Sequence, residues 1–133
     1  MAYLDWKDEF SVGIAEMDTQ HKRWIEIINE LHDAMKNGQT LKVLSSVLKK
    51  MTDYIVVHFK AEEALLEKNN YPDLAKHRKI HEKYALEIHG LVDQFVKGKV
   101  LMSLEIMDSL KNWLTNHIKM SDKEYGKFIT GRK

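Results

Sequence analysis

Apolar residues recur at alternating steps of three and four along four stretches of the chain. This spacing places each set on one face of an α-helix, as in the inward-facing seam of a helical bundle. It predicts four helices, over residues 18–37, 40–68, 72–97 and 100–121. The four sets are Trp24, Ile28, Leu31 and Met35; Leu44, Leu48, Met51 and Ile55; Leu74, Tyr84, Ile88, Leu91 and Phe95; and Ile106, Leu110 and Trp113.

Residues that start or stop helices separate these stretches. Short polar side chains cap helix N-termini, glycine ends helices, and asparagine and proline break them. They are Asp18 and Thr40 as N-caps, Gly38 and Gly98 as stops, and Asn69, Asn70 and Pro72 as the break before the third helix. Short connections imply antiparallel neighbours. The expected fold class is all-α: one domain over residues 1–133, an up-down-up-down antiparallel four-helix bundle with an N-terminal lead-in segment.

Polar residues occupy core positions when each apolar seam is extended by the same steps. They are His21, His58, Glu62, His77, His81 and His117. At about 1.5 Å per residue, all six lie roughly 5–15 Å from the same end of the predicted bundle. Burying such groups without partners is costly, so something must satisfy them. A lone histidine on an apolar face is usually a core residue, but this convergence of four helices predicts a metal site.

Spacing within the helices agrees with that prediction. His58 and Glu62 are four residues apart, as are His77 and His81, and such pairs share a helix face. Asp122 follows His117 by five residues, which suits a shared site only if the fourth helix ends or widens near residue 121. We include Asp122 among the predicted ligands. His32 and His89 lie away from the predicted site, and we interpret them as structural or solvated residues.

Five histidines and two carboxylates are too many ligands for one tetrahedral zinc. They suit two octahedral ions, where bridging carboxylates and a bridging oxo or hydroxo group would leave about one position of twelve open. Imidazole also binds zinc, copper and nickel, so the spacing alone does not select iron.

Composition excludes several other functions. With 21 basic and 20 acidic residues, the net charge near +1 gives no field to attract nucleic acid or anionic lipid. The absence of cysteine excludes disulfides, iron–sulfur clusters and thiol catalysis. No apolar run reaches the roughly 18 residues of a membrane span, and the polar N-terminus does not resemble a signal peptide. We therefore expect a cytoplasmic protein without membrane insertion, and the near-neutral surface is compatible with a monomer.

The ligand pattern resembles that of the hemerythrins, in particular the single-domain bacteriohemerythrins. The resemblance covers nearly the whole chain, and all seven family ligands are present. It rests on Trp6, the run SVGI at 11–14, DTQHK at 18–22, HFKAE at 58–62, HRKIH at 77–81 and HIKMSD at 117–122.

The resemblance implies two non-haem iron ions (Fe2+/Fe3+) with an oxo or hydroxo bridge, which bind O2 reversibly. It assigns His77, His81 and His117 to one iron, and His21 and His58 to the second, open iron. It makes Glu62 and Asp122 the bridging ligands, with O2 bound end-on to the open iron and held as hydroperoxide. Family positions that line the O2 pocket match Trp24, Phe59, Trp113, Leu114 and Ile118.

We expect an O2-binding protein for carriage, storage or delivery rather than an enzyme, with any O2-consuming partner protein unidentified. One alternative is a di-iron oxidase, but the Glu-x-x-His pairs of that class are absent. A second alternative is an O2 or redox sensor, whose family members usually carry a fused signalling domain. Tyr54 and Tyr84 lie on ligand-bearing faces and either orient ligands or simply pack in the core.

Overall fold

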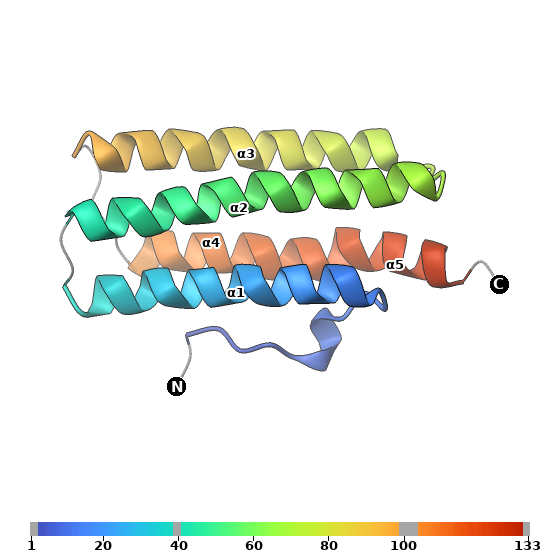
Figure 1. Cartoon of the computed structure of the whole chain (residues 1–133), viewed down its shortest axis with the longest axis horizontal. Helices are drawn as coiled ribbons and strands as arrows, with labels where there is room; N and C mark the ends of the chain where they lie inside the picture. Colours follow the sequence, from blue (N-terminus) through green and yellow to red (C-terminus); the bar gives the residue numbers. More distant parts are fainter. Residues whose placement is uncertain (1–2, 39–40, 99–103, 132–133) are drawn as a thin grey trace.

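Four long helices run alternately up and down in the computed structural model, which describes residues 3–38, 41–98 and 104–131 (Figure 1). They are α1 (Ala15–Lys36), α2 (Leu41–Lys68), α3 (Leu74–Val96) and α4 (Leu104–His117). A π-helical turn, Ile118–Asp122, joins α4 to the short helix α5 (Lys123–Thr130), which continues along the same line. The described ranges contain no strand, and the predicted all-α antiparallel bundle is confirmed. None of their helices combines the length and apolar character that a bilayer span requires.

The start of α1 differs from the prediction. The helix begins at Ala15, and Asp18 lies inside its first turn instead of capping it. The Asp18 carboxylate accepts hydrogen bonds from the backbone N–H of Val12 at 2.8 Å and from the Ser11 hydroxyl at 2.5 Å. A short acid four residues into a helix can reach back to the preceding chain, so Asp18 fixes the lead-in segment against the helix.

The predicted stops are confirmed where the structure describes them. Gly38 and Gly98 follow α1 and α3 with φ of 66° and 74°, a left-handed conformation that glycine adopts without a steric cost. Asn70, with φ of 54°, also adopts the left-handed conformation, in the connection between α2 and α3. Pro72 precedes α3 by two residues and does not form its first turn. Thr40 and the predicted start of the fourth helix near residue 100 lie outside the described residues.

The fourth helix widens where the spacing of His117 and Asp122 required it, but it does not end there. A π turn holds more residues than an α turn, so a five-residue separation brings both side chains to one face. Helical structure then continues to Thr130, beyond the predicted helix over residues 100–121. Tyr125 and Gly126 are buried by this continuation.

The lead-in segment runs alongside α1, as Figure 1 shows, and is tied to the bundle. The backbone N–H and carbonyl of Leu4 bond the side-chain amide of Asn29 at 2.8 Å each. Phe10, in a short 3-10 turn (Asp8–Phe10), and Val12 are buried against the bundle. The segment therefore packs along the side of α1 and reaches the π turn and α5, close to the predicted ligands.

Gly126 is where α5 and the lead-in backbone approach most closely. A Cβ at this position would lie 2.2 Å from the Val12 carbonyl oxygen, which is backbone and cannot rotate away. We expect Gly126→Ala to lower the free energy of unfolding by about 1–3 kcal/mol, measured by urea denaturation. Gly90→Ala is the matched control, because nothing lies within 4 Å of its added Cβ. It should stabilise α3 by about 0.5–1 kcal/mol. Equal effects of both variants would contradict the tight packing of α5.

Candidate metal centre

All seven predicted ligands are buried at one end of the bundle. His21 comes from the start of α1, and His58 and Glu62 come from the end of α2. His77 and His81 lie near the start of α3, while His117 ends α4 and Asp122 is the last residue of the π turn. The antiparallel order brings these four segments together because helix starts and helix ends alternate at each end of such a bundle.

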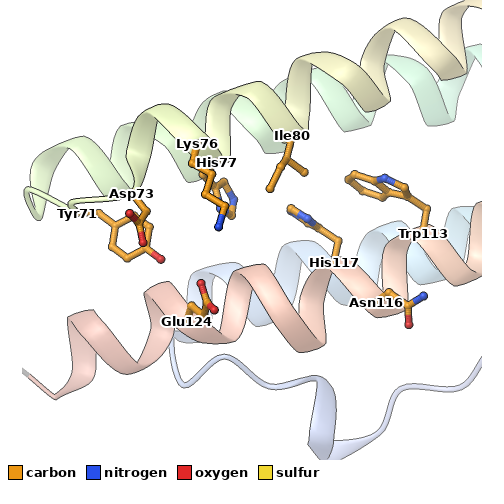
Figure 2. Close-up of a pocket in the computed structure, with 9 residues that line it drawn as sticks. All are labelled: Tyr71, Asp73, Lys76, His77, Ile80, Trp113, Asn116, His117 and Glu124. Carbon is orange, nitrogen blue, oxygen red and sulfur yellow. The ribbon is translucent and has the colours of Figure 1, made fainter.

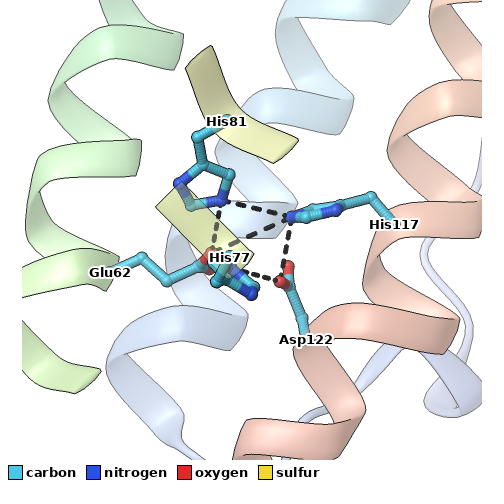
Figure 3. A group of neighbouring side chains, drawn as sticks. All are labelled: Glu62, His77, His81, His117 and Asp122. Atoms are coloured by element: carbon cyan, nitrogen blue, oxygen red, sulfur yellow. Dashed lines mark hydrogen bonds and ion pairs between the residues drawn. The ribbon is translucent and has the colours of Figure 1, made fainter. Parts of the chain in front are cut away.

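The ligand atoms form two groups that share both carboxylates. Within each group the atoms lie within 4.8 Å of one another. The larger group, drawn in Figure 3, is Glu62, His77, His81, His117 and Asp122; the smaller is His21, His58, Glu62 and Asp122.

The two oxygens of each carboxylate face different groups. Glu62 Oε1 lies 2.7 Å from His77 Nε2 and 3.0 Å from His81 Nε2. Glu62 Oε2 lies 3.5 Å from His21 Nε2 and 3.3 Å from His58 Nε2.

Asp122 repeats this division. Its Oδ1 lies 3.0 Å from His117 Nε2 and 3.3 Å from His77 Nε2. Its Oδ2 lies 3.0 Å from His21 Nε2. Each carboxylate is therefore placed to bridge two neighbouring cations.

Several of these atoms satisfy no hydrogen bond within the described structure. They are Nδ1 and Nε2 of His21, Nε2 of His58 and both carboxylate oxygens of Asp122. The imidazole nitrogens approach the carboxylates but do not align with them as donors. Buried polar atoms without partners cost about 1–3 kcal/mol each. These nitrogen and oxygen atoms converge on a shared space and do not hydrogen-bond to each other. This arrangement suits a cation bound between them.

The electrostatics of the metal-free site show how tightly its charges are coupled. Burial by itself would raise the pKa of Glu62 and Asp122, but the surrounding histidines hold both well below their usual values. Burial would lower the pKa of His21 and His77, but Asp122 and Glu62 outweigh it and raise both to about 9. His21 and His77 are therefore protonated at neutral pH in the metal-free site, and a metal must displace those protons.

Three residues that the sequence did not single out contact the ligands. Gln20 Oε1 lies 2.6 Å from His58 Nδ1, and Glu63 Oε2 lies 3.0 Å from His81 Nδ1. Tyr125 donates its hydroxyl hydrogen bond to Glu62 Oε2 at 2.9 Å. Tyr125 follows Asp122 by three residues, a same-face signal that becomes visible only when the tail is known to be helical.

The two tyrosines considered from the sequence have different roles. The Tyr54 hydroxyl donates to the Gln20 carbonyl oxygen at 2.8 Å, so it fixes α1 beside His58. Tyr84 packs on Trp113 with ring centroids 3.5 Å apart, and its buried hydroxyl has no partner among the described residues. Tyr84 is therefore a packing residue.

An aromatic wall, formed by Trp24, Phe59, Tyr84 and Trp113, covers the core side of the histidines. Phe59 stacks on His81 at a centroid distance of 3.8 Å, and Trp113 stacks on His117 at 4.6 Å. Trp24 lies 5.7 Å from His58, centroid to centroid. Leu114 and Ile118 are fully buried. Of the five predicted pocket residues, Trp24, Phe59, Leu114 and Ile118 are buried, whereas Trp113 is half-buried and also lines a surface cavity. The contact of all five with O2 stays a prediction.

The opposite side of the larger group opens into a cavity of about 420 Å³ between α3 and the α4–α5 segment (Figure 2). His77 and His117 line it and are the most exposed of the seven ligands, at 3% and 7%. Asp73, Lys76 and Glu124 also line it and are exposed. The three-histidine group therefore contacts solvent through imidazole edges, whereas the two-histidine group is enclosed.

The two histidines expected to lie outside the site do so. His32 stacks on Tyr3 with ring centroids 4.1 Å apart, and His89 is exposed on α3. Neither belongs to a potential metal-binding group among the described residues.

The chain is similar to known proteins along nearly its whole length. The sequence model of the family described as Hemerythrin HHE cation binding domain matches residues 12–129. A bacteriohemerythrin of Pseudomonas aeruginosa is 37% identical over 125 residues, covering 94% of this chain and 80% of that protein. A bacteriohemerythrin of Methylococcus capsulatus is 33% identical over 127 residues, covering 95% and 96%. The solved structure of wild-type hemerythrin is 32% identical and matches with a TM-score of 0.89, covering 94% of this chain and 96% of that one.

We expect His77→Ala to reduce metal content and to destabilise the protein by about 3–5 kcal/mol, because Glu62 and Asp122 stay buried with one partner fewer. Metal analysis and urea denaturation would measure both effects. His89→Ala is the matched control on the same helix and should change stability by less than about 0.5 kcal/mol, with full metal content. Unchanged metal content in His77→Ala would refute the ligand assignment.

The metal-free protein should show a stability maximum between about pH 4.5 and 6.5. Histidines with raised pKa stabilise the fold fully below the ordinary value of 6.5 and lose this contribution as pH rises through about 9. Carboxylates with lowered pKa contribute above the ordinary value of 4.5 and lose that contribution in acid. Urea denaturation of chelator-treated protein at pH 3, 5.5 and 9 would measure this. A flat profile would contradict the coupling of these charges.

Proposed function

Because this chain belongs to the hemerythrin family, we propose that it binds O2 reversibly at a pair of non-haem irons. The observation that carries the proposal is the bridging placement of Glu62 and Asp122, whose oxygens divide between two groups of imidazoles. Two fully buried carboxylates in this arrangement suit two adjacent cations better than one.

The grouping of the side chains supports the division of ligands between the irons. His77, His81 and His117 would hold one iron, and His21 and His58 the other, with Glu62 and Asp122 shared. The smaller group offers one imidazole fewer and would leave a position for O2. We propose that O2 would bind there end-on and be held as hydroperoxide, with its proton supplied by the hydroxo bridge. When bound, the two irons supply the electrons that O2 takes up on binding and returns on release.

The protein's own residues protect this chemistry. Trp24 and Phe59 pack against His58, and His21, His58, Leu114 and Ile118 are all buried, so the two-histidine group is separated from water. Water and protons promote irreversible oxidation of the metal, so their exclusion favours release of O2 unchanged. Tyr125 holds one oxygen of Glu62 and limits movement of that bridging carboxylate.

Binding rather than catalysis is favoured by the donor set. The ferritin-like di-iron class uses glutamate from several helices together with Glu-x-x-His pairs. Here five imidazoles accompany two carboxylates, and the relatives are named as hemerythrins. A cytoplasmic location and a monomeric state stay predictions from the sequence.

The test is an optical spectrum of reduced protein under argon, in air and again under argon, with iron counted on the same sample. We expect two irons per chain, no visible band when reduced, and a charge-transfer band that appears in air and disappears under argon. Irreversible oxidation with two irons bound would refute reversible O2 binding but keep the metal centre. Failure to retain iron after loading the metal-free protein would refute both.

A further inference from the structure

We infer that Gln20 and Glu63 are positioning residues that make the two metal sites electronically unequal. Each accepts a hydrogen bond from the outer nitrogen of one ligand histidine, Gln20 as a neutral amide and Glu63 as a carboxylate. The inference rests on the proposed di-iron centre and specifies how its two halves differ.

Gln20 acts on the two-histidine group. His58 presents Nε2 to Glu62 at 3.3 Å, so its outer nitrogen Nδ1 carries the hydrogen that is donated to Gln20 Oε1, 2.6 Å away. The Tyr54 hydroxyl fixes Gln20 through its backbone carbonyl at 2.8 Å, and the Tyr54 and His58 rings are parallel to within 3°. The amide thus fixes the ring and its tautomer without adding a charge.

Glu63 acts on the three-histidine group. His81 presents Nε2 to Glu62 at 3.0 Å and donates from Nδ1 to Glu63 Oε2, also at 3.0 Å. Arg78 binds the other oxygen of Glu63 through Nε at 3.2 Å and reaches Glu67 at 3.5 Å. The carboxylate is therefore held in place by a cation on the surface.

The outer nitrogens of the other three ligand histidines have no side-chain acceptor among the described residues. His77 and His117 turn toward the cavity in Figure 2, and Nδ1 of His21 is buried without a hydrogen-bond partner. In the part of the chain that the structure describes, each metal group therefore has one histidine with a side-chain acceptor on its outer nitrogen. The two acceptors differ in charge.

This difference has a predictable direction. A carboxylate acceptor makes a metal-bound imidazole more basic and a better electron donor, which favours the oxidised, more highly charged metal. An amide orients the ring but gives less of this effect. Glu63 therefore favours oxidation at the three-histidine iron, while Gln20 keeps the iron that binds O2 biased toward its reduced form.

Two near-isosteric substitutions test the inference. Gln20→Glu should lower the midpoint potential of the iron-loaded protein, and Glu63→Gln should raise it, in mediated titrations under argon. We expect each to change the redox equilibrium constant by about tenfold, which is about 59 mV for one electron.

Matched controls separate hydrogen bonding from general charge. Thr19→Glu adds a charge at an exposed position beside Gln20, and Glu67→Gln removes the other carboxylate that pairs with Arg78. Both should leave the potential close to that of the wild type. Arg78→Gln should lower it, because Glu63 then acts on His81 without a compensating cation. This surface variant is 44% exposed and tests the same mechanism without altering a partner of histidine.

Shifts in the same direction for Gln20→Glu and Glu63→Gln, or shifts no larger than their controls, would overturn the inference. If either variant failed to retain two irons, the Arg78→Gln potential would decide. The proposed function fails separately: wild-type protein with two irons and no reversible O2 band would refute O2 binding. Shifts of the midpoint potential in opposite directions for Gln20→Glu and Glu63→Gln would still support two unequal metal sites in that case.

Discussion

Two carboxylates with no solvent exposure lie at the centre of a 133-residue bundle, and the rest of the structure depends on compensating their charge. An isolated buried carboxylate would take up a proton, because burial strongly disfavours its ionised form. Glu62 and Asp122 instead stay ionised, since five imidazoles surround them. That requirement draws side chains from four helices to one end of the bundle. Several of their nitrogen and oxygen atoms have no hydrogen-bond partner in the described structure and face a space that suits cations.

The backbone departs from regular α-helix to meet this requirement. The π turn of Ile118–Asp122 places the side chains of Asp122 and His117 on the same face of the helix. In a regular α-helix, a residue five positions after His117 would point in a different direction. The continuation into α5 then buries Tyr125 against Glu62 and brings Gly126 against the lead-in backbone. One irregular turn thus couples the metal centre to the packing of both ends of the chain.

The surroundings of the centre are as asymmetric as its ligands. The two-histidine group faces the enclosed interior, and its outer hydrogen bond goes to a neutral amide. The three-histidine group is backed by a carboxylate and reaches a solvent-accessible cavity through His77 and His117. For a centre proposed to bind O2 and release it unchanged, enclosure belongs on the side of the open position. The carboxylate contact of Glu63 and the solvent in the cavity then act on the iron that the three histidines would hold, which is not the one proposed to bind O2.

The amino-acid pattern was enough to predict the four helices, their antiparallel order and the set of candidate ligands. Apolar periodicity, glycine stops and the depth of each polar residue are local properties, and they project directly onto a helix face. The contacts of Asp18, Gln20, Glu63 and Tyr125 became apparent only once the helices were packed together. Neighbouring residues on a helix point in different directions, and whether Gln20 or Glu63 meets a histidine depends on how two helices are rotated against each other. That rotation is set by packing between distant segments, which no local pattern encodes, whereas the widening at the π turn was already indicated by the five-residue spacing of His117 and Asp122.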